Sequence, residues 1–269
     1  MTVFDLTGRA ALVTGGARGL GAGMAEALAR AGAGADVVIA DRLGDLAAET
    51  AEKIAASGVR AMPVTMNVTV EEDWERAVAT TVERLGRFDI LVNNAGIELS
   101  ALLVDVDPDD LRRIFEVNVV GTALGIKHAF RAMRPGGSAG AGGSIVNIAS
   151  VAATIAFPGI GGYSASKSAV DRLTRVAAVE SGKLGYGVRV NCVYPGLVPT
   201  EMGSKLAVDM AELGLWPSPE AAVGDVVGLT PLGRLGEVSD MADAVVFLAS
   251  DAARFVTGAG LPVDGGMGS

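Results

Sequence analysis

Short apolar runs alternate with longer amphipathic segments along the chain. Runs such as Asp36–Asp41 (DVVIAD) and Gly143–Ala149 (GSIVNIA) are rich in Val and Ile and have the length of buried strands. Longer segments such as Glu71–Leu85 have the length and pattern of helices, and this one carries acidic residues in its first turn, which suits a helix N-terminus. Strand and helix in strict alternation predict βαβ units, and hence a mostly parallel sheet with helices on both faces.

The pattern therefore predicts one doubly wound α/β domain over residues 1–269, built on a seven-stranded sheet. Residues 195–233 break the alternation, and a loop of that length is typical of a lid or a binding loop, so we expect a substrate lid at about 200–230. The expected strands are 9–14, 36–41, 61–67, 88–93, 143–149, 187–194 and 260–263, and the expected helices are 19–32, 43–57, 71–85, 107–133, 163–183 and 237–250.

Composition excludes several classes of function. The net charge of −9 argues against a nucleic-acid binder, because neutralising phosphates needs a basic surface. The single Cys192 excludes an internal disulfide, and with one histidine (His128) it cannot build a typical zinc site, so we expect no metal. With no signal peptide and no apolar run of the roughly 20 residues that span a bilayer, we expect no membrane association and a cytoplasmic location.

A glycine-rich turn, Thr14–Gly21 (TGGARGLG), joins the first strand to the first helix. Gly15, Gly19 and Gly21 would let the backbone approach a pyrophosphate, while the helix N-terminus offers unpaired N–H donors. An ordinary strand-to-helix turn explains the glycines alone about equally well. Their position after the first strand favours phosphate binding in a Rossmann-type fold, with Arg18 and Leu20 in the same loop.

Asp41 ends the second strand, about 20 residues beyond the glycine turn, where a carboxylate can accept hydrogen bonds from adenosine ribose hydroxyls and repel a 2′-phosphate. A helix N-cap is the structural alternative for this aspartate. Arg18 and Arg42 complicate the choice, because either could hold a 2′-phosphate. The aspartate favours NAD over NADP as the cofactor.

A second group of residues has the pattern of a catalytic site. Tyr163 and Lys167 stand four apart at the start of a helix, so both project from one face. A neighbouring ammonium and a positively charged nicotinamide ring would favour the phenolate, which makes the tyrosine a usable acid or base. Ser150 follows the fifth strand and could hydrogen-bond a substrate carbonyl. Each residue alone fits an ordinary structural role as well.

Together these motifs resemble the short-chain dehydrogenase/reductase family in its compact, single-domain form, over essentially the whole chain. Within the family the chain most resembles bacterial NAD-dependent hydroxysteroid and secondary-alcohol dehydrogenases, through residues 67–78 and 164–180. The matching motifs are the TGGARGLG loop, Asn93-Asn94-Ala95-Gly96, Asn118, Ser150, Tyr163, Lys167, Pro195-Gly196 with Val198 and Thr200, and Val263-Asp264-Gly265-Gly266.

The resemblance implies a role for each matching residue. Asn118 would hold a water that links Lys167 to solvent, and Ser150, Tyr163, Lys167 and Asn118 would be the catalytic set. Where the family usually has Asp-Val, this chain has Asn67-Val68, and we expect the Asn67 carbonyl oxygen still to accept a hydrogen bond from adenine. The implied cofactor-binding residues are Gly15, Arg18, Gly19, Leu20, Gly21, Asp41, Arg42, Asn67, Val68, Asn94, Ala95, Gly96, Tyr163, Lys167, Pro195, Gly196, Val198 and Thr200.

The substrate side is expected to be apolar, which suits a hydrophobic ketone or secondary alcohol. Packing of the lid against the core or another subunit would explain the same apolar residues nearly as well. Glu98 could face the mouth of the pocket or simply water. The expected substrate-binding residues are Ser150, Ala152, Phe157, Tyr163, Met202 and Leu206.

The combined reading is a reversible, NAD-dependent conversion of an apolar secondary alcohol to a ketone, with Tyr163 as proton donor and acceptor. One alternative is an NADPH-dependent 3-oxoacyl-thioester reductase, which Asp41 disfavours. Another is a catalytically silent nucleotide-sensing protein on the same fold. The family resemblance also suggests a homotetramer packed through the two long helices and the C-terminal segment.

Overall fold

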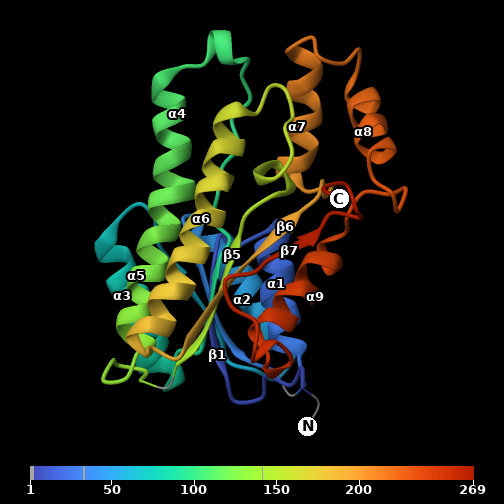
Figure 1. Ribbon diagram of the computed structural model, residues 1–269. Helices are drawn as coiled ribbons and strands as arrows, with labels where there is room; N and C mark the ends of the chain where they lie inside the picture. Colours follow the sequence, from blue (N-terminus) through green and yellow to red (C-terminus); the bar gives the residue numbers. More distant parts are fainter. Residues whose placement is uncertain (1–2, 33, 141) are drawn as a thin grey trace.

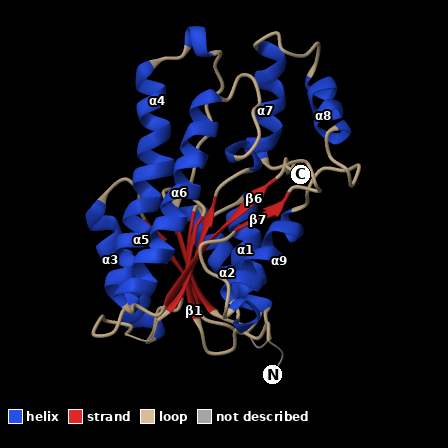
Figure 2. Ribbon diagram, in the orientation of Figure 1, coloured by secondary structure: helices blue, strands red, loops and turns tan. Residues whose placement is uncertain are grey.

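The computed structural model describes residues 3–32, 34–140 and 142–269. Its centre is a sheet, drawn in red in Figure 2. The sheet is parallel and has seven strands in the order β3-β2-β1-β4-β5-β6-β7, which confirms the predicted sheet. The strands are β1 (Ala10–Thr14), β2 (Asp36–Asp41), β3 (Ala61–Thr65), β4 (Ile90–Asn93), β5 (Gly143–Ile148), β6 (Val188–Pro195) and β7 (Gly260–Val263).

Helices cover both faces of this sheet (Figure 1). On one face α1 (Gly19–Arg30), α2 (Gly44–Ala55) and α9 (Val238–Ala249) bury a core that includes Met24, Leu28 and Val245. On the other, α3 (Glu71–Leu85), α5 (Gly121–Met133) and α6 (Gly161–Leu184) bury a core around Trp74, Phe130 and Met133. Both faces of the strands are thus apolar, which explains their continuous hydrophobic runs.

The expected helix over 107–133 is made of three parts. Its first part is α4 (Pro108–Phe115), its last is α5, and between them the π-helical turn η2 (Glu116–Val120) contains Asn118. Asp107 caps the start by accepting a hydrogen bond from the Asp109 amide, with Pro108 in the first turn. Single π turns inside helices commonly occur at functional sites, because they move one side chain out of the regular register.

The expectation of an irregular segment over 195–233 is wrong, because that segment contains two helices. They are α7 (Glu201–Glu212) and α8 (Pro219–Gly228), which stand beyond the carboxyl edge of the sheet (Figure 1). The Thr200 and Ser218 hydroxyls cap them, accepting hydrogen bonds from Gly203 N and Ala221 N, each at 3.3 Å. Three short 3-10 turns complete the fold: η1 (Leu103–Asp105), η3 (Val151–Ala153) and η4 (Asp251–Ala253).

Across the described ranges, we find no helix whose length and hydropathy would allow it to cross a membrane.

Candidate active site

A cavity of about 710 Å³ opens at the carboxyl ends of the strands, where α/β sheets of this kind bind ligands. The segments that follow β1, β2, β3, β4, β5 and β6 all contribute to its wall. It extends from the glycine turn after β1 to the lid helices α7 and α8. Every predicted cofactor or substrate residue lines it except Gly21, which is buried beneath the glycine turn.

The glycine turn has a shape that only glycine allows. Gly15 has a φ of +62°, and a Cβ there would lie 2.9 Å from the Ala95 Cα. A Cβ on Gly21 would come within 2.1 Å of the Gly15 carbonyl oxygen. The Asn94 Nδ2 donates hydrogen bonds to the carbonyls of Thr14 and Gly15, both at 3.0 Å. Asn94 therefore holds the turn in place, a role that the sequence did not reveal.

Asp41 stands at the tip of β2, beside this turn. Its Oδ2 accepts a hydrogen bond from Ala17 N at 3.1 Å and its Oδ1 accepts one from Leu43 N at 3.0 Å. A carboxylate oxygen has two lone pairs, so both oxygens keep capacity for ribose hydroxyls on the cavity side. Arg18 forms an ion pair with Glu201, the first residue of α7, which draws its guanidinium towards the lid.

Asn67 follows β3 and lines the cavity with Val68. Its side-chain oxygen accepts a hydrogen bond from Thr69 N at 3.2 Å, and its backbone amide donates to Asp73 at 2.7 Å. The side-chain oxygen that is expected to accept a hydrogen bond from adenine thus already accepts one hydrogen bond within the loop. One lone pair remains for a ligand.

Asn118 in the π turn is fully buried behind the cavity wall. Its Oδ1 accepts from Ile97 N at 2.8 Å, and its Nδ2 donates to the Ile97 carbonyl at 2.9 Å and to Ser166 Oγ at 3.0 Å. The side chain therefore braces the strand end next to Gly96. The proton relay expected for Asn118 stays a prediction.

Ser150, Tyr163 and Lys167 come together at one place in the cavity. Ser150 lies two residues beyond β5, in extended conformation at the start of η3, while the other two lie on one face of α6. The Lys167 Nζ lies 5.6 Å from the centroid of the Tyr163 ring and donates a hydrogen bond to the Ile148 carbonyl at 2.7 Å. Ser150 in turn hydrogen-bonds Tyr163 and lowers the pKa of the phenol.

Burial shifts both ionisable groups of this trio. Burial raises the pKa of Tyr163 to about 12, against the hydrogen bond from Ser150, and the charge of Glu98 raises it further. Burial also lowers the pKa of Lys167 to about 8. At neutral pH the phenol therefore carries its proton, and the ammonium is still mostly charged.

The segment after β6 forms another part of the cavity wall, and its end at Thr200 lies next to Gly19 of the glycine turn. Gly196 N donates to the Val263 carbonyl of β7 at 3.0 Å, and a Cβ on Gly196 would lie 2.9 Å from Asp264 Cα. Val198 accepts a hydrogen bond from Thr200 N at 2.7 Å just before α7 begins. The bend packs closely against the segment around Val263 and Asp264, and Pro195, Gly196, Val198 and Thr200 line the cavity.

The part of the cavity next to α7 and α8 is apolar. Ala152 and Ile160 pack with Met210 of α7 and Ala222 of α8, and Phe157, Tyr163, Leu206 and Trp216 adjoin this cluster. Met202, Leu206 and Met210 also line the cavity, so the lid residues both pack on the core and face the cavity. Trp216 Nε1 donates a hydrogen bond to Asp225 Oδ2 at 2.5 Å and so ties the segment after α7 to α8.

Glu98 belongs to this site, although the sequence left its position open. It is only 7% exposed and lines the cavity. The signal that could have placed it is its distance of two residues from the Asn94-Ala95-Gly96 motif, on the segment that leaves a strand at the carboxyl edge.

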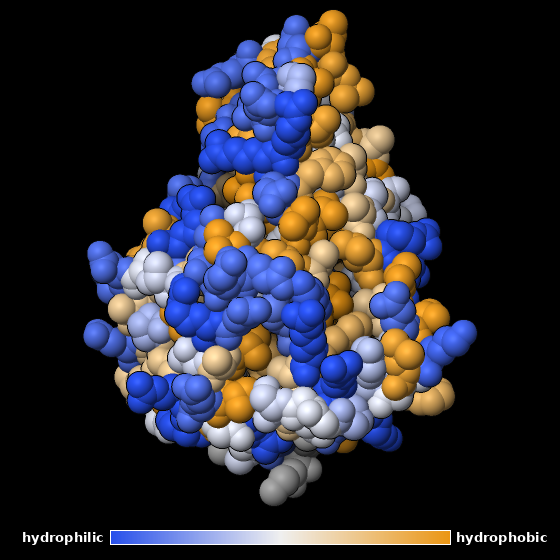
Figure 3. All heavy atoms as spheres, turned by 90° about the vertical axis from the view of Figure 1, so that its left-hand side faces the viewer, coloured by the Kyte–Doolittle hydropathy of each residue, from blue (hydrophilic) through white to orange (hydrophobic). Residues whose placement is uncertain are grey.

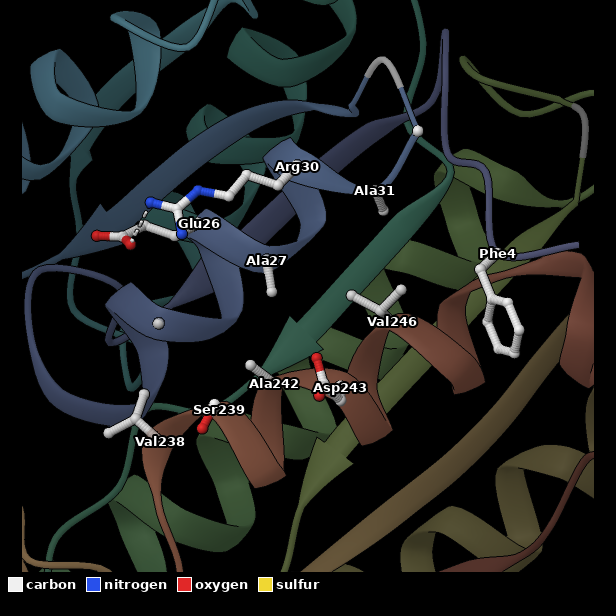
Figure 4. Close-up of a pocket in the computed structure, with 12 residues that line it drawn as sticks. Phe4, Glu26, Ala27, Arg30, Ala31, Val238, Ser239, Ala242, Asp243 and Val246 are labelled. Carbon is white, nitrogen blue, oxygen red and sulfur yellow. Dashed lines mark hydrogen bonds and ion pairs between the residues drawn. The ribbon is translucent and has the colours of Figure 1, made fainter. Parts of the chain in front are cut away.

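A second hollow of about 450 Å³ lies between α1 and α9, on the opposite side of the sheet from α5 and α6 (Figure 4). Its floor is made of small side chains such as Ala27 and Ala242, and the ion pair between Glu26 and Arg30 stands on its rim. Among the described residues, its lining shares no member with the first cavity.

Comparisons with known proteins agree with this geometry. The family model described as enoyl-(acyl carrier protein) reductase matches residues 15–268. The trans-4-hydroxycyclohexanecarboxylate dehydrogenase of Sinomonas cyclohexanicum is 40% identical, with 96% of this chain and 92% of the relative covered. The 2,5-dichloro-2,5-cyclohexadiene-1,4-diol dehydrogenase of Sphingobium indicum is 40% identical, with 98% of each chain covered.

Solved structures give the same result. An NAD⁺-bound xylitol dehydrogenase superposes with a TM-score of 0.89 at 30% identity, covering 97% of this chain and 99% of the other. A gluconate 5-dehydrogenase from Burkholderia cenocepacia, in complex with NADP and tartrate, has a TM-score of 0.85 at 36% identity, covering 98% and 96%. With the sheet order, the glycine turn and the serine, tyrosine and lysine in one cavity, these matches show that the chain is an oxidoreductase of the short-chain dehydrogenase/reductase family, whose members use a nicotinamide cofactor.

Proposed function

We propose that this enzyme reversibly converts an apolar secondary alcohol, cyclic in the simplest case, to a ketone with NAD as the cofactor. The observation that carries the proposal is the convergence of Ser150 and Lys167 on Tyr163 inside the cavity that begins at the glycine turn. Two relatives named for dehydrogenating six-membered ring alcohols support the substrate class. The apolar cluster under the lid supports it too.

The chain's own residues fit a dinucleotide. Gly15 lets the glycine turn pack against Ala95 because no Cβ lies between them, and α1 begins just after this turn, so its N-terminal amides would be available to a pyrophosphate. Asp41 would accept hydrogen bonds from the adenosine ribose, which supports NAD over NADP. When bound, the nicotinamide accepts or supplies the hydride.

Four side chains would bind the substrate and move the proton. Ser150 would hold the substrate oxygen by a hydrogen bond. During oxidation the acceptor would be the Tyr163 phenolate, which the charges of Lys167 and of a bound nicotinamide ring would favour, and it would take the hydroxyl proton of the alcohol as the C–H bond loses its hydride. During reduction the protonated Tyr163 would return that proton to the oxygen of the ketone. Protonated Lys167 would favour the phenolate by its charge and bind the nicotinamide ribose. Asn118 would connect Lys167 to solvent through a water.

The lid and the assembly belong to the same proposal. α7 and α8 would act as the substrate lid over residues 200–230, within one domain that spans the chain. We also propose a homotetramer packed through α5, α6 and the C-terminal segment, supported by Val176 and Val179 on α6, which are 47% and 70% exposed.

Tyr163→Phe tests the chemistry. The variant should bind NADH as the wild type does, while kcat for cyclic, aryl and steroid secondary alcohols falls about a hundredfold to ten-thousandfold, because the proton acceptor is gone. NADH absorbance reports turnover and NADH fluorescence reports binding. Tyr186→Phe is the matched control, because Tyr186 packs edge-on against Phe130, away from the cavity. A wild-type protein that binds NAD and oxidises no alcohol of the panel would favour the nucleotide-sensing alternative.

A further inference from the structure

A buried carboxylate faces the substrate half of the cavity. Glu98 is more than nine-tenths buried, and it lines the same cavity as Tyr163. Its charge raises the pKa of the Tyr163 phenol. This is an unusual position for an acidic residue, because the surrounding lining from Phe157, Leu206 and Met210 is apolar.

The hydrogen bonding of Glu98 is incomplete. Its Oε1 accepts a hydrogen bond from Ser100 Oγ at 2.7 Å. Across residues 3–32, 34–140 and 142–269, no side chain or backbone amide donates to Oε2. Burial raises the pKa of the Glu98 carboxyl, and only the Ser100 hydrogen bond and the more distant Lys205 lower it. One acceptor oxygen thus remains for whatever enters the cavity.

The charged residues of the lid do not neutralise Glu98. Lys205 and Asp209, four residues apart on α7, form an ion pair with each other. Asp209 raises the pKa of Glu98 while Lys205 lowers it, so their effects oppose each other. A carboxylate buried without a full set of partners is costly, and a ligand that brings a hydrogen-bond donor would remove part of that cost.

We propose that Glu98 Oε2 accepts a hydrogen bond from a second hydroxyl of the substrate, so that the enzyme selects diols over the corresponding monoalcohols. This inference rests on the proposed function, because the reacting hydroxyl is the one held at Ser150 and Tyr163. The second hydroxyl is not oxidised in that turnover. Its role is to position the ring so that the reacting carbon meets the nicotinamide side of the cavity.

Binding to the NADH-loaded enzyme tests the assignment without needing turnover. Calorimetry would measure Kd for cyclohexanol and for the isomeric cyclohexanediols with wild type, Glu98→Leu, Glu98→Gln and Glu212→Leu. The wild type should bind at least one diol about tenfold or more tightly than cyclohexanol, as expected for a hydrogen bond to a charged group. Glu98→Leu should bring this ratio close to one, and Glu98→Gln, which keeps an acceptor oxygen, should retain part of it.

Glu212→Leu is the matched control and should keep the wild-type ratio, because Glu212 is exposed at the end of α7. A wild type that binds no diol more tightly than cyclohexanol, or a Glu98→Leu variant that keeps the preference, would overturn the proposal. A Lys205→Met variant whose preference for the diol over cyclohexanol falls as far as that of Glu98→Leu would also overturn the proposal. Glu98 would then act only by holding α7 in place through the charge of Lys205. Turnover of the same alcohols by the wild type with NAD, measured in a separate experiment, tests the proposed function without testing the role of Glu98.

Discussion

The fold holds Tyr163 and Lys167 at positions where loss of solvent disfavours the charged form of each side chain. Lys167 is buried and Tyr163 is partly buried, and the loss of solvent disfavours the phenolate of Tyr163 and the ammonium of Lys167, giving pKa values of about 12 and about 8. Strongly shifted groups inside a cleft commonly mark functional sites, and here they are the two residues that the motif singles out. The fold keeps a charged lysine where an apolar side chain would be more stable.

Lys167→Met should therefore stabilise the protein at pH 7 while removing its activity. A shift from 10.5 to about 8 corresponds to ~3 kcal/mol of destabilisation of the charged form. Loss of the hydrogen bond to the Ile148 carbonyl offsets part of this, leaving a gain of about 1 to 2 kcal/mol in the free energy of unfolding. Urea unfolding measures the difference, with the exposed Lys183→Met as the control.

The same variant carries a pH dependence of defined sign. The folded pKa of Lys167 lies below its unfolded value, so between pH 8 and 10.5 the unfolded state binds more protons and the wild type becomes more stable as pH rises. The advantage of Lys167→Met should shrink across that window. An advantage of constant size from pH 7 to pH 10 would show that the lysine is not desolvated as the structure indicates.

Asp41 is expected to set the choice of cofactor. Asp41→Ala should lower the ratio of kcat/KM for NAD to that for NADP by at least about tenfold, because the repulsion of a 2′-phosphate is removed. Asp41→Asn removes the charge but keeps one acceptor oxygen, so it can still accept the hydrogen bond from Ala17 N or the one from Leu43 N, and it disturbs the loop less than Asp41→Ala does. The exposed Asp45→Ala serves as the control. If the ratio of kcat/KM for NAD to that for NADP is the same in the wild type and in both Asp41 variants, a residue other than Asp41 binds the adenosine ribose.

At the scale of elements, the parallel core was predicted from the sequence, but α7 and α8 were not, because their segment was expected to be a loop. The strands β2 and β4 are continuous apolar runs. Such runs are typical of strands that are buried on both faces of a parallel sheet. Part of each of these two helices faces the cavity, and among their residues only Ala207, Met210 and Ala222 are buried. The sequence does contain a helix-capping signal for each helix, Thr200 before Glu201 and Ser218 before Pro219, but each signal consists of only two residues.

The helix over 107–133 illustrates the same limit. Its residues all suit a helix, and the backbone stays right-handed helical through Phe115, Val120 and Gly121. The π turn arises because Asn118 must meet Ile97 and Ser166, which belong to other segments. A contact with distant segments cannot be read from local periodicity.

At the scale of the whole molecule, apolar side chains remain outside the core. Val176 and Val179 stand exposed on α6, and Figure 3, which views the molecule from the side of α4 and α5, shows hydrophobic residues gathered in a band beside strongly hydrophilic patches. Exposed apolar surface of this kind commonly marks a subunit interface. It supports the proposed tetramer.

Val179→Asp should dissociate that assembly, because a buried unpaired charge at an interface is unfavourable. Light scattering coupled to gel filtration should give the mass of a tetramer for the wild type and a smaller species for the variant. Val104→Asp, at a comparably exposed position in η1, should leave the mass unchanged. A wild-type mass equal to that of one chain would contradict the proposal.

The order of the strands and the position of the glycine turn were determined by the sequence alone, as was the choice of Ser150, Tyr163 and Lys167 as the residues that we propose to react. Each depends on local pattern or on residue types that few other roles require, and parallel strands bring their carboxyl ends to one edge. The tertiary structure decided what those residues touch: that Asn94 fixes the glycine turn, that Asn118 braces Ile97, and that Glu98 is buried beside Tyr163. Such contacts join segments far apart in the chain, and burial there, rather than residue type, sets the charge and hydrogen bonding that each side chain retains.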